Sequence, residues 1–495
     1  MNRIDSNVEP LDPEIRPIAP ARQEAPPTGA MSEASWSELF SGANAVRSLV
    51  LAGGVGLHAT NIYVATTILP SVVHDIGGLE YYAWSTALFV VTSIVGSALS
   101  AKLLERFGSK AAYAVAAIVF GLGALICAGA WSMAMLLVGR AIQGFGGGLL
   151  FALPYALIRL VFEERLWPRA MTILSGMWGI ATLIGPAVGG VFAEMGAWRA
   201  AFWSLLPITI LFTALAVTVL PKRSAGAGAG AGSPIAVTQL SLLMTAVLAL
   251  SAGSVSTSVA WNAAGIAVAG VVSVLLVFVE KRSPRRLLPR GAFQLTSPFW
   301  ALYATMCLLA VTVTSSEIFM PLFFQTLHGQ SPLAAGYLAA LMAAGWTLGS
   351  ISSAGATGKR VSRVFRLAPA LMFAGMCALA VLVPRPSAGS FWQLAPTCLA
   401  LVAVGFGVGL AWPHLLTRVL GAAREDEALV ASSSLTTVQL FATSLGAALA
   451  GMVANLGGLG SSLEVAGVST AARFLFVTFA IGPALGIFTS SRIGE

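Results

Sequence analysis

The sequence predicts an all-α polytopic membrane protein with fourteen transmembrane helices, arranged as two parallel six-helix repeats plus a central helix pair. Its 495 residues are 57% hydrophobic and only 10% charged, whereas soluble domains usually carry about 25% charged residues. Apolar runs of roughly 20 residues, the length that crosses a bilayer, occur in groups of six, two and six. Lysine and arginine gather in alternate loops between these runs. We therefore expect the chain to cross a membrane many times.

The chain divides into a tail, two helical bundles and a region between them. Residues 1–45 carry acids and prolines without an apolar run, which is typical of a disordered tail rather than of a signal peptide. After this cytoplasmic tail, the predicted units are a six-helix bundle at 46–221, a flexible linker at 222–234, an extra helix pair at 235–280, a basic cytoplasmic loop at 281–297 and a six-helix bundle at 298–495.

Each predicted span is an apolar run long enough to cross the bilayer. The first bundle has runs near 48–73, 82–104, 111–130, 133–161, 170–193 and 200–220. The central pair lies near 235–253 and 259–279 and is rich in alanine, glycine and serine. The second bundle has runs near 299–324, 333–356, 367–384, 392–416, 428–454 and 471–490.

The distribution of basic residues predicts the orientation. Of 28 lysines and arginines, 24 fall in the tail, the C-terminus and the loops on one side, and three fall in loops on the other. The positive-inside rule then places both termini in the cytoplasm, so we expect a multi-pass protein of the inner (plasma) membrane. The rule does not distinguish 14 spans from 12, since removing a hairpin preserves the orientation. The net charge of +8 follows from the same bias and implies no nucleic-acid partner.

Several functional classes lack their motifs. The four cysteines all lie in apolar runs, without a CxxC or Cys/His cluster, so neither a disulfide, a metal site nor a cofactor is implied. No GxxxxGK[ST] phosphate loop occurs, so ATP hydrolysis by this chain is not expected. No Ser/His/Asp constellation is apparent either, and the chain is not expected to be an enzyme.

The stretch 133–190 combines a buried charge with residues that permit close helix packing. Arg140 lies inside an apolar run, where a charge costs several kcal/mol unless it meets a partner or a water-filled cavity. Arg140 is followed by a group of glycines at 144–148, and a second group of small residues ends the stretch at 185–190. Glycines three or four residues apart let transmembrane helices approach closely, and a proline permits bending. We interpret the second group as packing and hinge residues, namely Gly185, Pro186, Gly189 and Gly190.

The two groups of six runs resemble copies of one repeat. Pro154 lies five residues before Arg159, just as Pro413 lies five residues before Arg418. At the same offset, Gly146 and Gly148 match Gly405 and Gly407. Two parallel six-helix repeats, with a cavity between them near the bilayer midplane, are typical of secondary transporters.

Three motifs resemble those of the major facilitator superfamily, and specifically its 14-span drug:proton antiporter branch. AKLLERFGSK at 101–110 is similar to the loop signature between spans two and three, LVGRAIQGFG at 137–146 to the fourth-span motif, and GPAVGG at 185–190 to the antiporter motif of span five. The resemblance covers roughly 48–490. It implies proton coupling for Arg140 and a cytoplasmic latch that holds the outward-facing state, made by Glu105, Arg106, Gly108 and Lys110.

One position departs from that branch. Its members usually carry an acid in span one, nine residues before the proline of an ALP-like ending. Here Thr67-Ile-Leu-Pro70 is that ending, and the acid position holds Asn61. A neutral amide carries no proton, so either another residue couples transport to protons or transport is not coupled.

Few side chains can carry a proton within the predicted spans. Glu317 is an acid that lies well inside an apolar run. His58 lies three residues before Asn61, so the two side chains share a helix face. A histidine titrates near neutral pH. We predict proton coupling by Glu317, Arg140 and His58. The structural alternatives are a glutamate bonded to Arg140 or to a neighbouring helix, and a histidine that only joins helices through hydrogen bonds.

The polar and aromatic side chains near these groups are candidates for substrate binding. Gln143 shares the helix face of Arg140, and aromatic rings suit a flat apolar ligand. For each aromatic residue alone, lipid contact or core packing is the commoner fate. The predicted substrate-binding residues are Asn61, Tyr63, Gln143, Trp178, Phe319 and Phe323.

Together these features predict a secondary active transporter. It is expected to export small organic, amphipathic or cationic, drug-like compounds in exchange for protons by alternating access, without ATP and as a monomer in the lipid bilayer. Asn61 favours an alternative, a proton-independent facilitator or importer of a specific metabolite.

Overall fold

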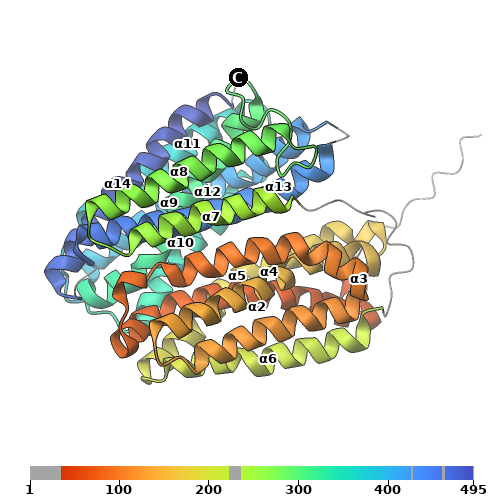
Figure 1. Ribbon diagram of the computed structural model, residues 1–495, viewed down its shortest axis with the longest axis horizontal. Helices are drawn as coiled ribbons and strands as arrows, with labels where there is room; N and C mark the ends of the chain where they lie inside the picture. The colour runs from red at the N-terminus through yellow and green to blue at the C-terminus, as the bar shows by residue number, and fades with distance from the viewer. Residues whose placement is uncertain (1–34, 222–235, 425–426, 460–462, 494–495) are drawn as a thin grey trace, which may run out of the picture.

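The computed structural model describes residues 35–221, 236–424, 427–459 and 463–493, and this part of the chain contains helices and no strand. Two helical bundles lie one above the other, and a helix pair from the middle of the chain covers the second bundle (Figure 1). Within these described ranges, thirteen helices are long and apolar enough to cross a membrane. The predicted all-α polytopic fold is therefore confirmed.

The first bundle begins earlier than the sequence suggested. Residues 35–45, predicted as part of a disordered tail, form a short helix and the start of the first span, because Ser35 and Glu38 make a capping box and Arg165 pairs with Glu38 at 2.7 Å. Residues 1–34 lie outside the described residues. The bundle comprises α1 (Trp36–Leu39), α2 (Gly42–Ile76), α3 (Trp84–Ala128), α4 (Met133–Val161), α5 (Trp167–Glu194) and α6 (Trp198–Val219).

Helix α3 accounts for two of the predicted spans. Its 45 residues would extend about 68 Å at 1.5 Å per residue, roughly twice the thickness of the bilayer core. The backbone turns at Gly108, with φ 75° and ψ 173°, a conformation that glycine adopts readily because it lacks a Cβ. With α3 counted as two spans, the thirteen helices make the expected fourteen crossings.

The central pair and the second bundle follow the predicted order. The predicted linker at 222–234 lies outside the described residues. The pair consists of α7 (Val237–Ser254) and α8 (Val259–Arg282). The second bundle contains α9 (Pro298–His328), α10 (Pro332–Ser353), α11 (Lys359–Leu382), α12 (Phe391–Ala422), α13 (Ala428–Ala454) and α14 (Val465–Ser491), with one π-helical turn at Asn455–Leu459.

Glycines of α4 and α12 confirm the repeat but correct its register. A Cβ on Gly148 would lie 2.1 Å from the Ser93 carbonyl oxygen of α3. A Cβ on Gly409 would lie equally close to the Trp346 carbonyl oxygen of α10. Gly148 therefore corresponds to Gly409 and not to Gly407. The predicted register was wrong by two residues, because glycines at every second position allow several matches.

This close approach predicts a large destabilisation by one added methyl group. Gly148→Ala should lower the free energy of unfolding by roughly 1–3 kcal/mol, because backbone atoms of α3 cannot move away as a flexible side chain would. Gly270→Ala in α8 is the matched control, since nothing lies within 4 Å of its Cβ position. Thermal unfolding of the two purified variants should separate them, and equal melting temperatures would contradict this packing.

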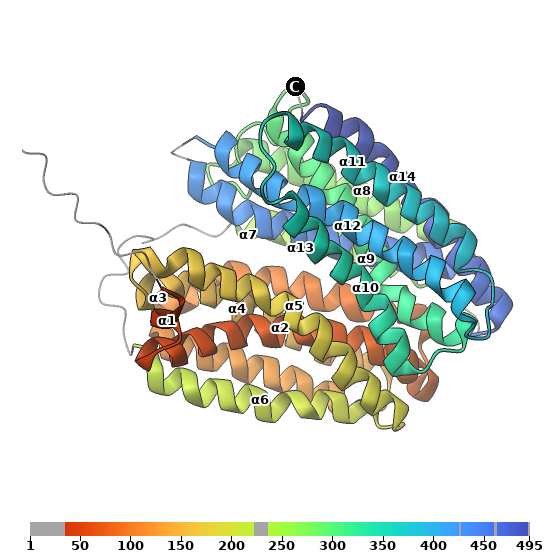
Figure 2. The same ribbon diagram turned by 180° about the vertical axis from the view of Figure 1, so that it is seen from behind.

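The two bundles are joined at one end of the molecule. We call the end where α2 begins and α14 finishes the terminal end, and the opposite one the distal end (Figure 2). The Asn455 amide donates to the carbonyls of Glu80 at 2.9 Å and Ser254 at 2.8 Å, and so links both bundles and the central pair. The Tyr337 hydroxyl donates to the Leu183 carbonyl at 3.1 Å. These hydrogen bonds between the bundles, together with the one that the Leu333 amide donates to Glu194 at 3.3 Å, lie at the distal end.

The orientation of the central pair can be measured directly. Reporter fusions after Gly230, Ser256 and Arg286 should report cytoplasmic, external and cytoplasmic positions, respectively, since α7 and α8 lie between these sites. Gly230 itself lies outside the described residues. A cytoplasmic signal at Ser256 would contradict the fourteen-span topology.

Candidate functional site

The acid predicted to carry a proton lies where the two bundles meet. Glu317 is half-buried on α9, and its carboxylate lies close to the Tyr63 hydroxyl of α2. Its helix neighbours Ser316 and Ile318 are 0% and 2% exposed, so this turn of α9 is largely enclosed by protein. Tyr63, predicted to bind substrate, is thus also the partner of Glu317 across the interface.

Arg140 is satisfied within the first bundle alone. Its side chain is 1% exposed. Nε donates to the Ser85 carbonyl at 3.2 Å, Nη1 donates to Oε1 of Gln143 at 2.7 Å, and the guanidinium lies 4.2 Å from the ring centre of Phe89. Within the described residues no carboxylate forms an ion pair with it. The structure therefore does not join Arg140 to Glu317, and Gln143 serves as its hydrogen-bond acceptor.

His58 and Asn61 are buried polar side chains without hydrogen-bond partners. They are 1% and 0% exposed, and in the described part of the protein neither ring nitrogen of His58 nor either amide atom of Asn61 is paired. An unpaired buried polar group costs roughly 1–3 kcal/mol. These two groups lie one turn apart on α2, a helix of the inter-bundle interface.

An aromatic cage surrounds His58. Its ring lies 5.2 Å from Phe89, 5.1 Å from Phe151 and 6.2 Å from Trp178, measured between centroids. Trp178 was predicted to line a substrate site, whereas Phe89 and Phe151 were missed. Phe151 could have been predicted from the sequence. It lies eleven residues after Arg140, which is about three helical turns, so both side chains are on the same face of α4.

Two predicted substrate-binding aromatics pack in the core instead. Phe319 and Phe323 are 1% and 0% exposed. Phe319 stacks on Tyr82 at 5.1 Å, and Phe323 contacts Phe476 at 6.0 Å. Both rings are therefore enclosed by protein in this conformation, and their role in substrate binding stays a prediction. One turn apart on α9, they face α14 and Tyr82, which precedes α3, rather than an open space.

The glycine–proline motif of α5 packs against both bundles. A Cβ on Gly185 would lie 2.3 Å from the Cβ of Tyr63, and one on Gly189 would lie 3.0 Å from the Val64 carbonyl oxygen. One on Gly190 would lie 2.5 Å from the Cα of Leu333 in α10. Pro186 also meets α10, because a Cβ added to Gly336 would lie 3.1 Å from the Cβ of Pro186. The motif therefore borders the Tyr63–Glu317 pair.

The residues predicted to form a latch lie at the terminal end. Glu105 and Arg106 are exposed, and Lys110 is half-exposed beyond the turn at Gly108. No ion pair of the described residues includes Glu105 or Lys110. The Arg106 guanidinium lies 5.4 Å from the ring centre of its neighbour Phe107. With the distal contacts formed, this arrangement matches a conformation closed at the distal end.

Comparison with known proteins agrees with this architecture. The sequence profile of the Major Facilitator Superfamily matches residues 51–447. A probable multidrug-efflux transporter of Mycobacterium tuberculosis is 38% identical over 462 residues, which cover 92% of this chain and 96% of that protein. Multidrug resistance protein 3 of Bacillus subtilis is 24% identical over 409 residues, with 81% and 77% coverage.

Solved structures show the same fold at low sequence identity. A D-xylose–proton symporter has a TM-score of 0.63 and 15% identity, covering 92% of this chain and all of that one. A bacterial homologue of the human lysosomal transporter Spinster, in an inward-facing and unoccupied conformation, has a TM-score of 0.62 and 15% identity, with 91% and 97% coverage.

Proposed function

The chain belongs to the Major Facilitator Superfamily, and from this membership we propose that it exports small organic, amphipathic or cationic compounds in exchange for protons by alternating access. Proteins of this family are transporters and not enzymes, and the thirteen apolar helices among the described residues make this chain a multi-pass integral membrane protein. The proposal places it in the inner (plasma) membrane with both termini cytoplasmic, so that the terminal end faces the cytoplasm.

The observation that carries the proposal is the pairing of Glu317 with Tyr63 across the two bundles. An antiporter needs a titratable group whose protonation is linked to the movement of its halves. Separating the bundles at the distal end would remove the Tyr63 hydroxyl from Glu317, and a carboxylate that loses a hydrogen-bond donor holds its proton more tightly. A proton could thus be taken up in one state and released in the other.

The cage around His58 supports an organic substrate. Phe151 and Trp178 supply flat apolar surfaces, and aromatic faces also attract cations, whereas the Phe89 face already carries the Arg140 guanidinium. His58 and Asn61 supply polar atoms that have no partner in the described protein. A ligand with an aromatic or cationic body and a polar group would fit this combination. The relatives named as multidrug transporters are consistent with such substrates.

Transport by the purified protein in liposomes tests the proposal. A compound panel should be concentrated against its gradient when a pH difference is imposed, and this accumulation should collapse when an ionophore removes the difference. Transport that only equilibrates substrate, with or without a pH difference, would support the alternative that Asn61 favours, a proton-independent facilitator or importer of a specific metabolite.

A further inference from the structure

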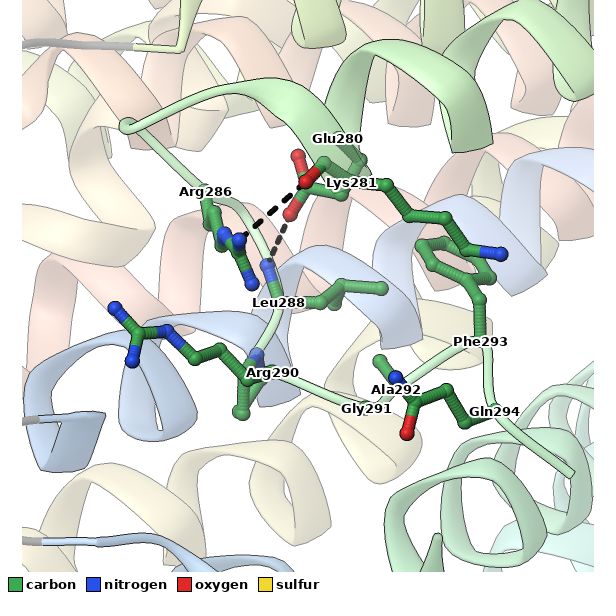
Figure 3. A pocket seen from close by; sticks show the side chains of 10 residues that line it. Glu280, Lys281, Arg286, Leu288, Arg290, Gly291, Ala292, Phe293 and Gln294 are labelled. Carbon is green, nitrogen blue, oxygen red and sulfur yellow. Dashed lines mark hydrogen bonds between the residues drawn. The ribbon is translucent and has the colours of Figure 1, made fainter. Parts of the chain in front are cut away.

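A pocket in the basic loop between α8 and α9 is separate from the transport site. It has a volume of about 370 Å³ and is lined by Glu280, Lys281, Arg286 and residues 288–294 (Figure 3). This size falls within the range of small-ligand pockets, roughly 300–1,000 Å³. The pocket belongs to the terminal end, where α8 finishes and α9 begins.

Buried polar groups hold the loop in shape. Glu280 is 4% exposed, and its Oε1 accepts the backbone amides of Leu287 at 2.6 Å and Leu288 at 2.8 Å. Gln239 of α7 donates to the Arg285 carbonyl at 2.6 Å. Because these contacts fix the backbone without a ligand, the pocket is preorganised, which lowers the entropic cost of binding.

The charges of the pocket favour an anion. Lys281, Arg286 and Arg290 line it together with the acid Glu280, so three positive groups face one carboxylate. Glu280 binds the loop backbone, and Glu427 accepts the Arg290 amide at 3.2 Å and its Nε at 3.4 Å. The Arg290 side chain remains 66% exposed. Guanidinium groups bind phosphate oxygens through paired hydrogen bonds, and lysine adds a point charge.

Apolar side chains on both sides of the pocket place it at the membrane surface. Phe278 of α8 is 49% exposed, and the Arg282 guanidinium lies 3.7 Å from its ring centre. Leu295, beyond the pocket, is 66% exposed. Basic groups next to such apolar surface lie where lipid head groups meet the hydrocarbon core. We propose that the pocket binds a phosphate group, carried by the head group of an anionic phospholipid.

Native mass spectrometry of the full-length protein with phosphatidylglycerol, phosphatidylcholine or inorganic phosphate tests this assignment. The variant Lys281→Gln/Arg286→Gln/Arg290→Gln should lose phosphatidylglycerol affinity by about fivefold for each charge removed. Its matched control is Lys359→Gln/Arg363→Gln/Arg366→Gln, which removes three charges from the same end of the molecule, at the start of α11. The control should bind as the wild type does. If the triple variant misfolds, Lys281→Gln, at an exposed side chain, should still lose about fivefold.

Three outcomes would overturn the proposal. Equal losses in the pocket and control variants would show diffuse surface attraction instead of a site. Unchanged affinity in the pocket variant would place lipid binding elsewhere. Displacement of the lipid by inorganic phosphate at equal affinity would assign the pocket to free phosphate. The proposal would be supported if the wild type and the control variant bind phosphatidylglycerol more tightly than phosphatidylcholine and only the pocket variants lose this preference.

Discussion

Replacing Glu317 by glutamine should abolish uphill export while leaving the protein folded. Glutamine keeps the size of the side chain and can still accept a hydrogen bond from Tyr63, but it carries no exchangeable charge. Export driven by a pH gradient should fall to the level of empty liposomes, because no proton can then be exchanged for substrate. Downhill exchange of labelled for unlabelled substrate should persist.

Two further variants separate this role from a general charge effect. Glu464→Gln removes an exposed acid just before α14 and should transport as the wild type does. Tyr63→Phe removes the hydroxyl that pairs with Glu317 and should weaken coupling without abolishing binding. Concentration of substrate by Glu317→Gln would show that the proton is carried elsewhere, and His58→Gln would then be the next variant to measure.

Replacing Arg140 by alanine should also abolish active export, at a moderate cost in stability. Arg140 donates to Gln143 and Ser85, and Nε2 of Gln143 has no partner in the described structure even in the wild type. Truncation would leave both ends of the Gln143 amide unpaired, which costs roughly 1–3 kcal/mol. Transport in liposomes and thermal unfolding together measure the two effects.

The lysine variant distinguishes charge from geometry at the same position. Arg140→Lys keeps a positive charge but cannot donate to Ser85 and Gln143 in the same planar arrangement, so export should be strongly reduced. Arg473→Ala, at an exposed position of α14, should have no effect. Wild-type export by Arg140→Ala would mean that the fourth-span motif serves packing alone.

The order and number of spans could be predicted because the bilayer imposes a length and a composition on every crossing. Glu317 and Arg140 could be identified as candidates for a similar reason, since charges within spans are rare and costly. The early helix at 36–39 was missed because one capped turn leaves no periodic signal. The repeat register was missed because alternating glycines in α4 and α12 match in more than one way.

The exact lining of the site depends on packing that a single sequence does not encode locally. Phe319 and Trp178 are both aromatic residues in apolar runs, yet Phe319 stacks on Tyr82 in the core and Trp178 lies beside His58. Their difference arises from helices distant in the sequence. The hydrogen-bond partner of Arg140 could not be predicted from the sequence either. A carboxylate on another helix and a glutamine one turn away are both chemically suitable acceptors.

The central claim is that the movement of one substrate through this protein is exchanged for a proton at Glu317. The most direct measurement loads liposomes with substrate at equal internal and external pH and follows the internal pH with a trapped dye. The account predicts that outward substrate flow acidifies the interior in the wild type, whereas Glu317→Gln exchanges labelled for unlabelled substrate without any change in internal pH. Substrate release by the wild type without any change in internal pH would contradict it.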